Sequence, residues 1–227
     1  MAVENEVMME RLSAVAGLKW LRAKIRARTG RTLVGIDGVD GSGKTTFADE
    51  LAELLRECGL SVIRISMDDY LNPAEVRHAQ GRTSAKGYVE DSYNQARISE
   101  DVLEPLAKDG SGRYRTASYN FKDECEVCSP WNVAPDDAVV VIDGMFLHGP
   151  KYWRAAGDKV WDISVWLDVP FAETYRRMAD RDGIPSDPED PANSRYYQGQ
   201  LMYIEACDPA SKADVVIDNS GSHDPVD

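Results

Sequence analysis

Short apolar runs alternate with longer stretches of helical periodicity along most of the chain. The runs at 32–37 (T-L-V-G-I-D) and 138–142 (A-V-V-V-I) are nearly continuous, which is typical of strands buried on both faces of a parallel sheet. Further strands are predicted at 60–65, 162–167 and 214–217. Because helices are predicted between these strands, the pattern indicates a doubly wound α/β domain, with a mostly parallel five-stranded sheet and helices on both faces.

Helices are predicted where apolar residues recur every three or four positions. They cover roughly 7–28, 45–56, 93–107, 171–179 and 194–206. The first belongs to an N-terminal extension (1–30) that we expect to pack on the edge of the domain or to form an oligomer contact. The whole chain, 1–227, is therefore expected to be one domain.

Three segments lack such periodicity. The polar stretch 72–92 is a long connection of the kind that usually carries function. The stretch 182–191 is rich in Gly, Pro and Asp and is predicted to be a loop. The end of the chain, 220–227, is expected to be frayed.

Composition narrows the class of protein. The chain has 227 residues, 43% of them hydrophobic and 29% charged, which suits a soluble protein with a substantial core. Its net charge of −13 argues against nucleic acid as a partner. Four cysteines do not form a disulfide framework, and neither a signal peptide nor a membrane-spanning run occurs. We therefore expect a reduced, cytoplasmic protein with no membrane partner, and leave open whether it forms a homo-oligomer.

The strongest chemical signal is G-V-D-G-S-G-K-T at 38–45, a complete phosphate-binding loop between a predicted strand and a predicted helix. Its glycines allow unusual backbone conformations, so that successive N–H groups point inward towards an anion. Lys44 supplies a charge for the β- and γ-phosphates, and the Thr45 hydroxyl is placed to bind Mg²⁺. The residues expected to bind the nucleotide are Gly38, Asp40, Gly41, Ser42, Gly43, Lys44, Thr45 and Thr46.

Acidic residues follow two of the predicted strands. Asp68 and Asp69 lie just after the strand at 60–65, and Asp143 follows the run at 138–142. Because ligands bind beyond the carboxyl ends of strands in open α/β sheets, these acids should lie near the γ-phosphate. An acid after 60–65 could accept a proton from a hydroxyl, or hold the metal through water. Asp143 fits the Walker-B position, which holds the metal.

Arginines are concentrated at the end of the helix that precedes the Gly/Pro-rich loop, in R-R-M-A-D-R-D at 176–182. Arginines on a mobile segment can close over the γ-phosphate and exclude water. This predicts a lid at 180–192. A surface cluster of salt bridges is the alternative.

These motifs together resemble the uridine kinase family, which groups with phosphoribulokinase and pantothenate kinase. The resemblance rests on G-x-x-G-S-G-K-T-T, S-x-D-x-Y at 66–70, the acid-Gly pair at 143–144, R-x-x-x-R-D at 177–182, and the late Tyr203, Pro209 and Asp214. It extends from about Thr32 to Asn219.

The resemblance implies ATP-dependent transfer of the γ-phosphate to a hydroxyl of a small molecule, with ATP and Mg²⁺ required. By position, Asp68 resembles the general base, and Lys44 and Arg181 complete the catalytic set. Thr45 and Asp143 are implied as metal ligands. The segment 110–130 (with Y-R-T-A-S-Y-N at 114–120) resembles the hairpin of the acceptor site. The implied acceptor-binding residues are Asp68, Tyr70, Tyr114, Tyr119 and Arg177.

The chain departs from that family at two places. The hairpin's Tyr119 is followed by Asn120 and Phe121, where the family has a His and an Arg, and Met178 stands where the lid has a further Arg. The acceptor therefore stays open among nucleosides, sugars and related metabolites. It is also open whether Asp68 or Asp69 is the base.

Other functions are less well supported. A GTPase needs a guanine-reading N-K-x-D segment, which the sequence lacks. A nucleotide-binding regulatory protein with little or no catalysis stays as the alternative. Cys125-x-x-Cys128 has no second Cys or His pair to complete a zinc site and is more simply a pair on a loop.

Overall fold

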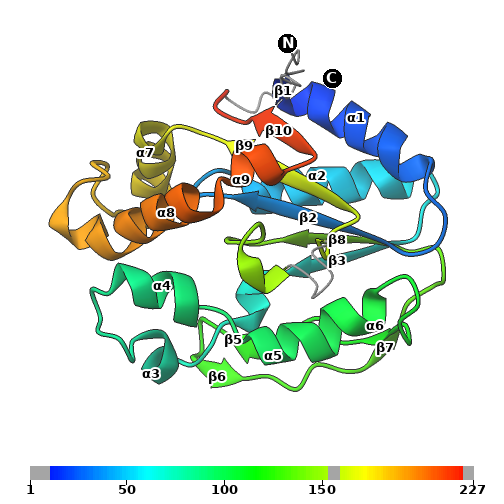
Figure 1. The fold of residues 1–227 in the computed structure, drawn as a ribbon, viewed down its shortest axis with the longest axis horizontal. Coiled ribbons are helices and arrows are strands. Elements are labelled where there is room, and N and C mark those ends of the chain that lie inside the picture. The colour runs from blue at the N-terminus through cyan, green and yellow to red at the C-terminus, as the bar shows by residue number, and fades with distance from the viewer. Residues whose placement is uncertain (1–10, 153–158, 222–227) are drawn as a thin grey trace, which may run out of the picture.

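The computed structural model describes residues 11–152 and 159–221. Within them, six parallel strands form the central sheet in the order β1-β10-β9-β2-β8-β3 (Figure 1). Their bounds are β1 (Arg11–Ser13), β2 (Thr32–Gly38), β3 (Val62–Ser66), β8 (Val139–Asp143), β9 (Ile163–Asp168) and β10 (Val215–Asp218). The predicted doubly wound α/β fold and its five strands are confirmed.

The sixth strand is a correction. The segment 7–28 was expected to be helical from its start, but β1 pairs with β10 and helix α1 (Ala14–Arg26) begins only after it. The Ser13 Oγ accepts a hydrogen bond from the Ala16 N–H at 3.4 Å and caps the helix at that point. Residues 7–10 of the expected helix, like 222–227 of the expected tail, lie outside the described residues.

The other predicted helices form with small shifts at their ends. They are α2 (Lys44–Glu57), a continuous helical stretch made of α5 (Gln95–Ile98), a π-helical turn (Ser99–Leu103) and α6 (Glu104–Leu106), then α7 (Phe171–Asp182) and α8 (Ser194–Cys207), with a short α9 (Pro209–Lys212) after it. The connection at 72–92 was expected to be irregular, yet it contains α3 (Ala74–Arg77) and α4 (Ala85–Asp91). The Ser84 Oγ caps α4 by accepting from the Gly87 N–H at 3.0 Å.

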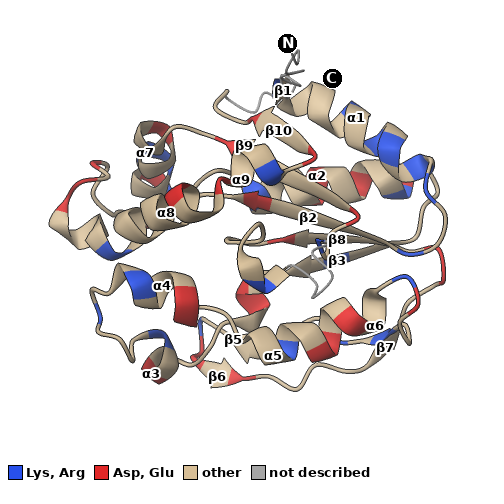
Figure 2. Ribbon diagram, in the orientation of Figure 1, with Lys and Arg blue, Asp and Glu red and all other residues tan. Residues whose placement is uncertain are grey.

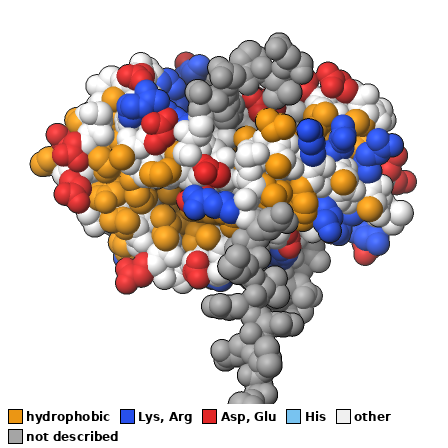
Figure 3. All heavy atoms as spheres, turned by 90° about the horizontal axis from the view of Figure 1, so that it is seen from above, with side chains coloured by type: hydrophobic (Ala, Val, Ile, Leu, Met, Phe, Trp, Pro, Cys, Tyr) orange, Lys and Arg blue, Asp and Glu red, His pale blue; other side chains and the backbone are white. Residues whose placement is uncertain are grey.

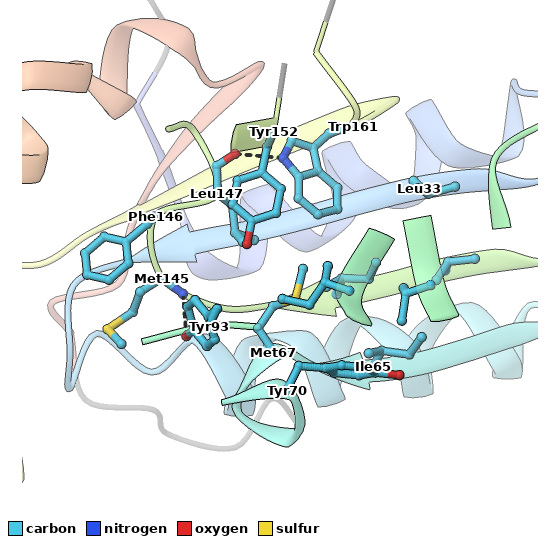
Figure 4. Close-up of a cluster of buried hydrophobic side chains, with 14 of the residues drawn as sticks. Leu33, Ile65, Met67, Tyr70, Tyr93, Met145, Phe146, Leu147, Tyr152 and Trp161 are labelled. Atoms are coloured by element: carbon cyan, nitrogen blue, oxygen red, sulfur yellow. Dashed lines mark hydrogen bonds between the residues drawn. The ribbon is translucent and has the colours of Figure 1, made fainter. Parts of the chain in front are cut away.

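The sheet is buried on both faces, as its apolar runs predict. In β8, Val139 and Val141 join a core cluster with α1 and α2, whereas Val140 and Ile142 join a larger cluster on the opposite face. Figure 4 shows the larger cluster, which includes residues from the segment after β8. Alternate residues of one strand therefore hold two layers of helices in place.

The charged residues lie mostly on the outer helices (Figure 2). Seen from above, Lys and Arg gather at the end that carries α1, and hydrophobic side chains gather at the opposite end, where α7 and α8 lie (Figure 3). No helix in the described ranges is long and apolar enough to cross a membrane.

Between β3 and β8 the chain also forms two small antiparallel pairs. Strand β4 (Arg113–Tyr114) pairs with β7 (Asn132–Val133), and β5 (Tyr119–Asn120) pairs with β6 (Cys125–Glu126). In the segment 110–130, where a hairpin was expected, β5 and β6 form such an antiparallel pair, whereas β4 lies with β7 near the end of the sheet at which β2 begins (Figure 1).

Gly35 provides a test of how tightly the larger core cluster is packed. A Cβ at this position would lie 2.6 Å from the Trp161 ring, and the Trp161 Nε1–H is tied to the Leu147 carbonyl oxygen at 2.8 Å. We expect Gly35→Ala to lower the free energy of unfolding by about 1–3 kcal/mol, because the ring has no room to move. Urea unfolding measures this as a lower midpoint with an unchanged slope.

Gly221→Ala is the matched control, since no atom lies within 4 Å of its added Cβ. It should change the free energy of unfolding by less than about 0.5 kcal/mol. If both variants unfold at the wild-type midpoint, Trp161 does not pack against β2 in this way.

Candidate functional site

The loop at residues 38–45 joins the end of β2 to the start of α2. Gly41 and Gly43 have φ values of 72° and 85°, in the left-handed region that favours glycine. Gly38 is needed for a different reason, because a Cβ there would lie 2.6 Å from the Ser42 Oγ. The expectation of an unusual backbone conformation therefore holds for two of the three glycines, and close packing explains the third.

A buried carboxylate holds the strand that leads into this loop. Asp37 is completely buried, and its Oδ1 accepts from the Gly38 N–H at 2.8 Å. Its Oδ2 lies 2.5 Å from the Tyr203 hydroxyl, 2.8 Å from His148 Nδ1 and 3.1 Å from the His148 backbone N–H. Burial beside Asp37 raises the pKa of the Tyr203 hydroxyl, so this group stays protonated as a donor.

Two further side chains hold the loop from distant parts of the chain. The Asn219 Nδ2 donates to the Ser42 carbonyl oxygen at 2.7 Å, and the Asp40 backbone N–H donates to Gln200 Oε1 at 2.6 Å. Neither Asn219 nor Gln200 belongs to a recognisable local motif. Sequence reasoning missed both for that reason.

The loop borders a cavity of about 150 Å³, called the phosphate cavity below. It is lined by Asp40, Gly41, Gly43, Lys44, Thr45, Thr46, Asp68, Asp143, Gly144, Met145 and Arg181. The predicted catalytic and metal-binding residues thus lie together, whereas Gly38 and Ser42 contribute to the loop without lining the cavity. The Lys44 Nζ donates to the Val39 carbonyl oxygen at 2.8 Å.

Thr45 and Asp143 lie side by side in this cavity. The Thr45 Oγ1 donates to Asp143 Oδ2 at 2.8 Å, and the Arg64 guanidinium donates to the other carboxylate oxygen at 2.7 Å. Asp143 is 2% exposed, so the ion pair with Arg64 offsets the cost of burying its charge. Oxygen atoms are the ligands that Mg²⁺ prefers, and the pair fits such an ion. Arg64, at a strand position with no motif, was not foreseen.

Asp68 lies at the point where the phosphate cavity meets a second cavity of about 200 Å³. Its Oδ1 accepts from the Tyr93 hydroxyl at 3.2 Å. The carboxylate reaches solvent through the cavities, yet the surrounding protein displaces enough water to raise the pKa of Asp68. Lys44 opposes this increase in pKa, and Asp143 adds to it.

Asp69 is arranged differently. It lines neither the phosphate cavity nor the second one, and its backbone carbonyl oxygen accepts from the Ser118 N–H at 2.9 Å. Burial also raises the pKa of Asp69, so the pKa does not separate the two acids. Their positions differ, because Asp68 lines both cavities and Asp69 lines neither.

The second cavity, called the acceptor-side cavity below, is lined by Asp40, Asp68, Leu71, Arg77, His78, Tyr88, Ser92, Phe121, Met145, Arg195 and Tyr196. Asp40 and Asp68 both border the two cavities. The Tyr88 hydroxyl donates to Asp40 Oδ2 at 2.5 Å. Both arginines are held by protein groups, Arg77 by Glu124 at 2.6 and 2.8 Å and Arg195 by backbone carbonyl oxygens.

Two of the tyrosines implied for acceptor binding have their hydroxyl groups engaged elsewhere. The Tyr70 hydroxyl donates to the Arg115 carbonyl oxygen at 2.9 Å, and the Tyr119 hydroxyl donates to Glu124 Oε2 at 2.7 Å. Neither residue lines the two cavities. Phe121, two positions after Tyr119, does line the acceptor-side cavity.

The remaining implied acceptor residues also lie apart from the cavities. Tyr114 packs half-buried against the larger core cluster. The Arg177 guanidinium bonds to Glu173 Oε1 at 2.8 Å and to the Asn219 carbonyl oxygen at 2.9 Å, which ties α7 to the end of β10. A role in acceptor binding for these side chains stays a prediction.

Arg176 and Arg181, from the cluster of arginines at 176–182, have different surroundings. Arg181 lines the phosphate cavity and pairs with Asp182 at 2.6 Å, with 69% of its side chain exposed. Arg176 is bonded to Glu173 and Asp180 on the outside of the same helix. The helix ends at Gly183, whose φ of 71° places it in the left-handed region.

The cysteines show no sign of a metal site. All four are free thiols, and Cys125 and Cys128 are exposed in the small hairpin. Within residues 11–152 and 159–221, no three His, Cys, Asp or Glu side chains form a group that could hold a metal.

The chain is similar to a known family of domains and to known kinases. A family model described as an AAA domain matches residues 34–198. Nicotinamide riboside kinase 1 of Homo sapiens is 26% identical to this chain over 175 residues, which cover 76% of the chain and 75% of that protein. A uridine kinase of Leuconostoc citreum is 25% identical over 150 residues, covering 66% of the chain and 68% of that protein.

Among solved structures, one described as a possible uridine kinase from Bacillus stearothermophilus superimposes with a TM-score of 0.68. It is 25% identical in sequence, and the match covers 88% of this chain and 97% of that one.

The phosphate cavity generates a prediction about Lys44. The Nζ–H makes one hydrogen bond, to the Val39 carbonyl oxygen, so Lys44→Ala should leave the melting temperature close to that of the wild type. It should weaken ATP binding by about 10- to 100-fold, because a hydrogen bond to a charged group contributes about 1.5–3 kcal/mol. Calorimetric titration measures this.

Lys19→Ala on the exposed side of α1 is the control and should bind ATP as the wild type does. Equal affinity of Lys44→Ala and the wild type would mean that triphosphate does not bind at this loop.

Proposed function

We propose that, in this chain, which belongs to the AAA domain family, Asp68 activates a hydroxyl of a nucleoside-like acceptor for attack on the γ-phosphate. The chain is an ATP-dependent small-molecule kinase, as its similarity to nicotinamide riboside kinase and uridine kinase supports. One observation carries the proposal. Asp68 borders both the phosphate cavity and the acceptor-side cavity, which supports a role for its carboxylate between the two substrates. A general base has to be within hydrogen-bond reach of the proton that it accepts.

The acceptor is proposed from the shape and chemistry of its cavity. Asp40 and Asp68 present two carboxylates at its boundary with the phosphate cavity, and carboxylates accept hydrogen bonds from hydroxyl groups. The aromatic rings of Phe121 and Tyr196 line the same cavity and can pack on a planar base. Nicotinamide riboside and uridine, which the names of two relatives contain, are both ribosides and combine these features.

In the proposed reaction, Asp68 accepts the proton of the attacking hydroxyl. The hydroxyl oxygen forms a bond to the γ-phosphorus while the bond to the β,γ-bridging oxygen breaks, which leaves ADP and a phosphate monoester. The raised pKa of Asp68 makes its carboxylate a stronger base than an ordinary aspartate. Tyr93 orients that carboxylate by donating a hydrogen bond to Oδ1.

The other residues of the phosphate cavity are proposed to bind the triphosphate. Lys44 and the N–H groups of the loop hold its negative charge, and Arg181 approaches from the last turn of α7. Thr45 and Asp143 would hold Mg²⁺, with Arg64 orienting the carboxylate. The ion, when bound, offsets negative charge on the phosphate oxygens.

We also propose a cytoplasmic location and no nucleic-acid partner, from the cysteines and the net charge. Four free thiols suit the reducing cytoplasm, and the net charge of −13 does not favour a nucleic-acid partner.

A phosphotransfer screen tests the function. Purified protein is incubated with Mg·ATP and, separately, ribonucleosides, their 2′-deoxy counterparts, sugars and pantothenate, and product is detected by mass spectrometry. We expect a monophosphate from a ribonucleoside and a smaller yield from the deoxy form, which lacks one hydroxyl for the two carboxylates. Binding of ATP with no transfer to any acceptor would favour a regulatory protein instead.

Asp68→Asn tests the general base. The amide cannot accept the proton, so kcat should fall by about 10²- to 10⁴-fold while ATP still binds. The base is active only when it is ionised, and burial raises the pKa of Asp68. As the pH is lowered, the activity of the wild type should therefore be lost at a pH above 3.8, the ordinary pKa of an aspartate. Asp69→Asn is the control and should retain most activity; the reverse order of effects would transfer the role to Asp69.

Arg181→Ala tests the lid. Since the Arg181 side chain is largely exposed and borders the phosphate cavity, we expect the segment at 180–192 to close over ATP and bring this charge to the γ-phosphate. Turnover should fall much more than ATP affinity, whereas Arg176→Ala, whose side chain faces outward, should remain active.

Limited proteolysis of residues 182–191 provides the second measurement. Protection should appear only when nucleotide and acceptor are both present. Equal cleavage in every state, together with an active Arg181→Ala enzyme, would reduce the cluster to surface charge.

A further inference from the structure

A third cavity lies behind the acceptor-side cavity, between α4, α8 and the segment after β8. Its volume is about 320 Å³, within the range of small-molecule pockets. It is lined by Lys86, Val89, Glu90, Tyr93, Gln95, Phe146, Gly149, Pro150, Lys151, Tyr152, Met202, Tyr203, Ala206 and Cys207. We call it the aromatic cavity. None of the phosphate-binding residues borders it.

Four aromatic residues, Tyr93, Phe146, Tyr152 and Tyr203, are among those that line the aromatic cavity. The hydroxyls of Tyr93 and Tyr203 bond outward, to Asp68 at 3.2 Å and Asp37 at 2.5 Å, and the Tyr152 hydroxyl accepts from Gln95 Nε2 at 3.2 Å. The Met145 N–H also donates to the Tyr93 hydroxyl, as the dashed line in Figure 4 shows. The hydroxyls of Tyr93 and Tyr203 are thus engaged away from the cavity, whereas Tyr152 and its partner Gln95 both line it.

This space is larger than a packing defect. Protein interiors rarely contain voids much bigger than a water molecule. Tyr93, Tyr152 and Tyr203 are 4%, 1% and 4% exposed and form the floor of this space. At the rim, Met202 is 44% exposed and Ala206 is exposed. Burial raises the pKa of the Cys207 thiol, so this group is neutral and adds to the apolar wall. Among the described residues, the cavity is therefore open on the side of Met202 and Ala206.

The rim carries more positive than negative charge. The Lys86 Nζ lies 3.8 Å from the Glu90 carboxylate, while the Lys151 Nζ donates to the Glu90 backbone carbonyl oxygen at 2.7 Å. Only Lys86 pairs with the Glu90 carboxylate, so the two ammonium groups and one carboxylate leave a net positive charge at this place. An anionic group at the mouth of the cavity would meet an excess of cationic charge.

We propose that the aromatic cavity is a second ligand site, which binds a small aromatic molecule that carries an anionic substituent. The ring system lies among Tyr93, Phe146 and Tyr203, where stacking and edge contacts favour aromatic groups. The anionic substituent lies at the rim beside Lys86 and Lys151. The site is separate from those of both substrates.

Tyr93 connects this site to catalysis. One side of its ring lines the aromatic cavity, and its hydroxyl holds Asp68 Oδ1. A ligand that contacts the ring restricts the position of that hydroxyl and so changes the environment of Asp68. This second part rests on the proposed function of Asp68, whereas the binding site does not depend on it.

The first experiment measures binding alone. The probe is 8-anilinonaphthalene-1-sulfonate, whose fluorescence increases in apolar sites, titrated into the full-length protein with saturating Mg·ADP so that the phosphate cavity is filled. We expect saturable binding that Ala206→Phe weakens by at least about tenfold, since a ring at the rim blocks entry. Met202→Trp blocks the same rim from another position and should act alike.

Glu205→Phe is the matched control, because it adds the same ring one position away on α8, at an exposed residue outside the cavity. It should leave the affinity unchanged. Equal affinity in the wild type and both blocked variants would overturn the proposed site, as would equal loss in Glu205→Phe.

The second experiment tests the chemical class. N-phenyl-1-naphthylamine has the same rings without the sulfonate and should bind more weakly than the sulfonate. Lys86→Gln combined with Lys151→Gln should weaken only the sulfonate, by several-fold. Equal binding of the two probes, or no effect of the lysine changes, would overturn the preference for an anion.

The third experiment tests the connection to Asp68. Tyr93→Phe keeps the ring and should still bind the probe, while the acid limb of its pH profile should move upward, because the lost hydrogen bond lowered the pKa of Asp68. The probe should alter the turnover of the wild type but not of Tyr93→Phe. Equal effects on both would overturn the role of Tyr93; an inactive protein that still binds the probe would count against the proposed function and not against the site.

Discussion

The buried carboxylate of Asp37 is the constraint on which the rest of the site depends. It lies at the end of β2, and burying it is favourable only because four donors surround it: two backbone N–H groups, a Tyr203 hydroxyl and the His148 ring. These donors come from the loop itself, from the segment after β8 and from α8. One buried charge therefore fixes three separate parts of the chain at the point where the phosphate-binding loop begins.

From that point the parallel sheet arranges the chemistry. Ser66 of β3 and Ile36 of β2 both pair with Asp143 of β8, so the strands that carry Asp68, the loop and the proposed metal ligand end at one edge. Parallel strands end together in this way whenever helices return the chain to the same side of the sheet. Strand register thus brings the loop, Asp68 and Asp143 together, and hydrogen bonds from Tyr93 and Arg64 hold the carboxylates of Asp68 and Asp143.

The difference between local patterns and contacts between distant residues explains what could be predicted from the sequence. Apolar runs such as 138–142 identify buried strands, and the phosphate-binding loop is a local motif, so both were foreseen. Arg64, Tyr93, Gln200 and Asn219 act through partners that are distant along the chain, up to 177 positions for Asn219 and Ser42. No local pattern records such contacts. The strand β1 was missed for a related reason, since only its pairing with β10 distinguishes it from the helix that follows.

The hydrogen bond from Asn219 to the Ser42 carbonyl oxygen has a consequence for biosynthesis. The loop at 38–45 leaves the ribosome early, but the residue that holds it is translated some 177 positions later. Until then the growing chain contains the loop without the hydrogen bond from Asn219. Strand β10, which precedes Asn219, has not yet paired with β9. The hydrogen bond that holds the loop at Ser42 can therefore form only after translation has passed β10, when every strand of the central sheet has been made.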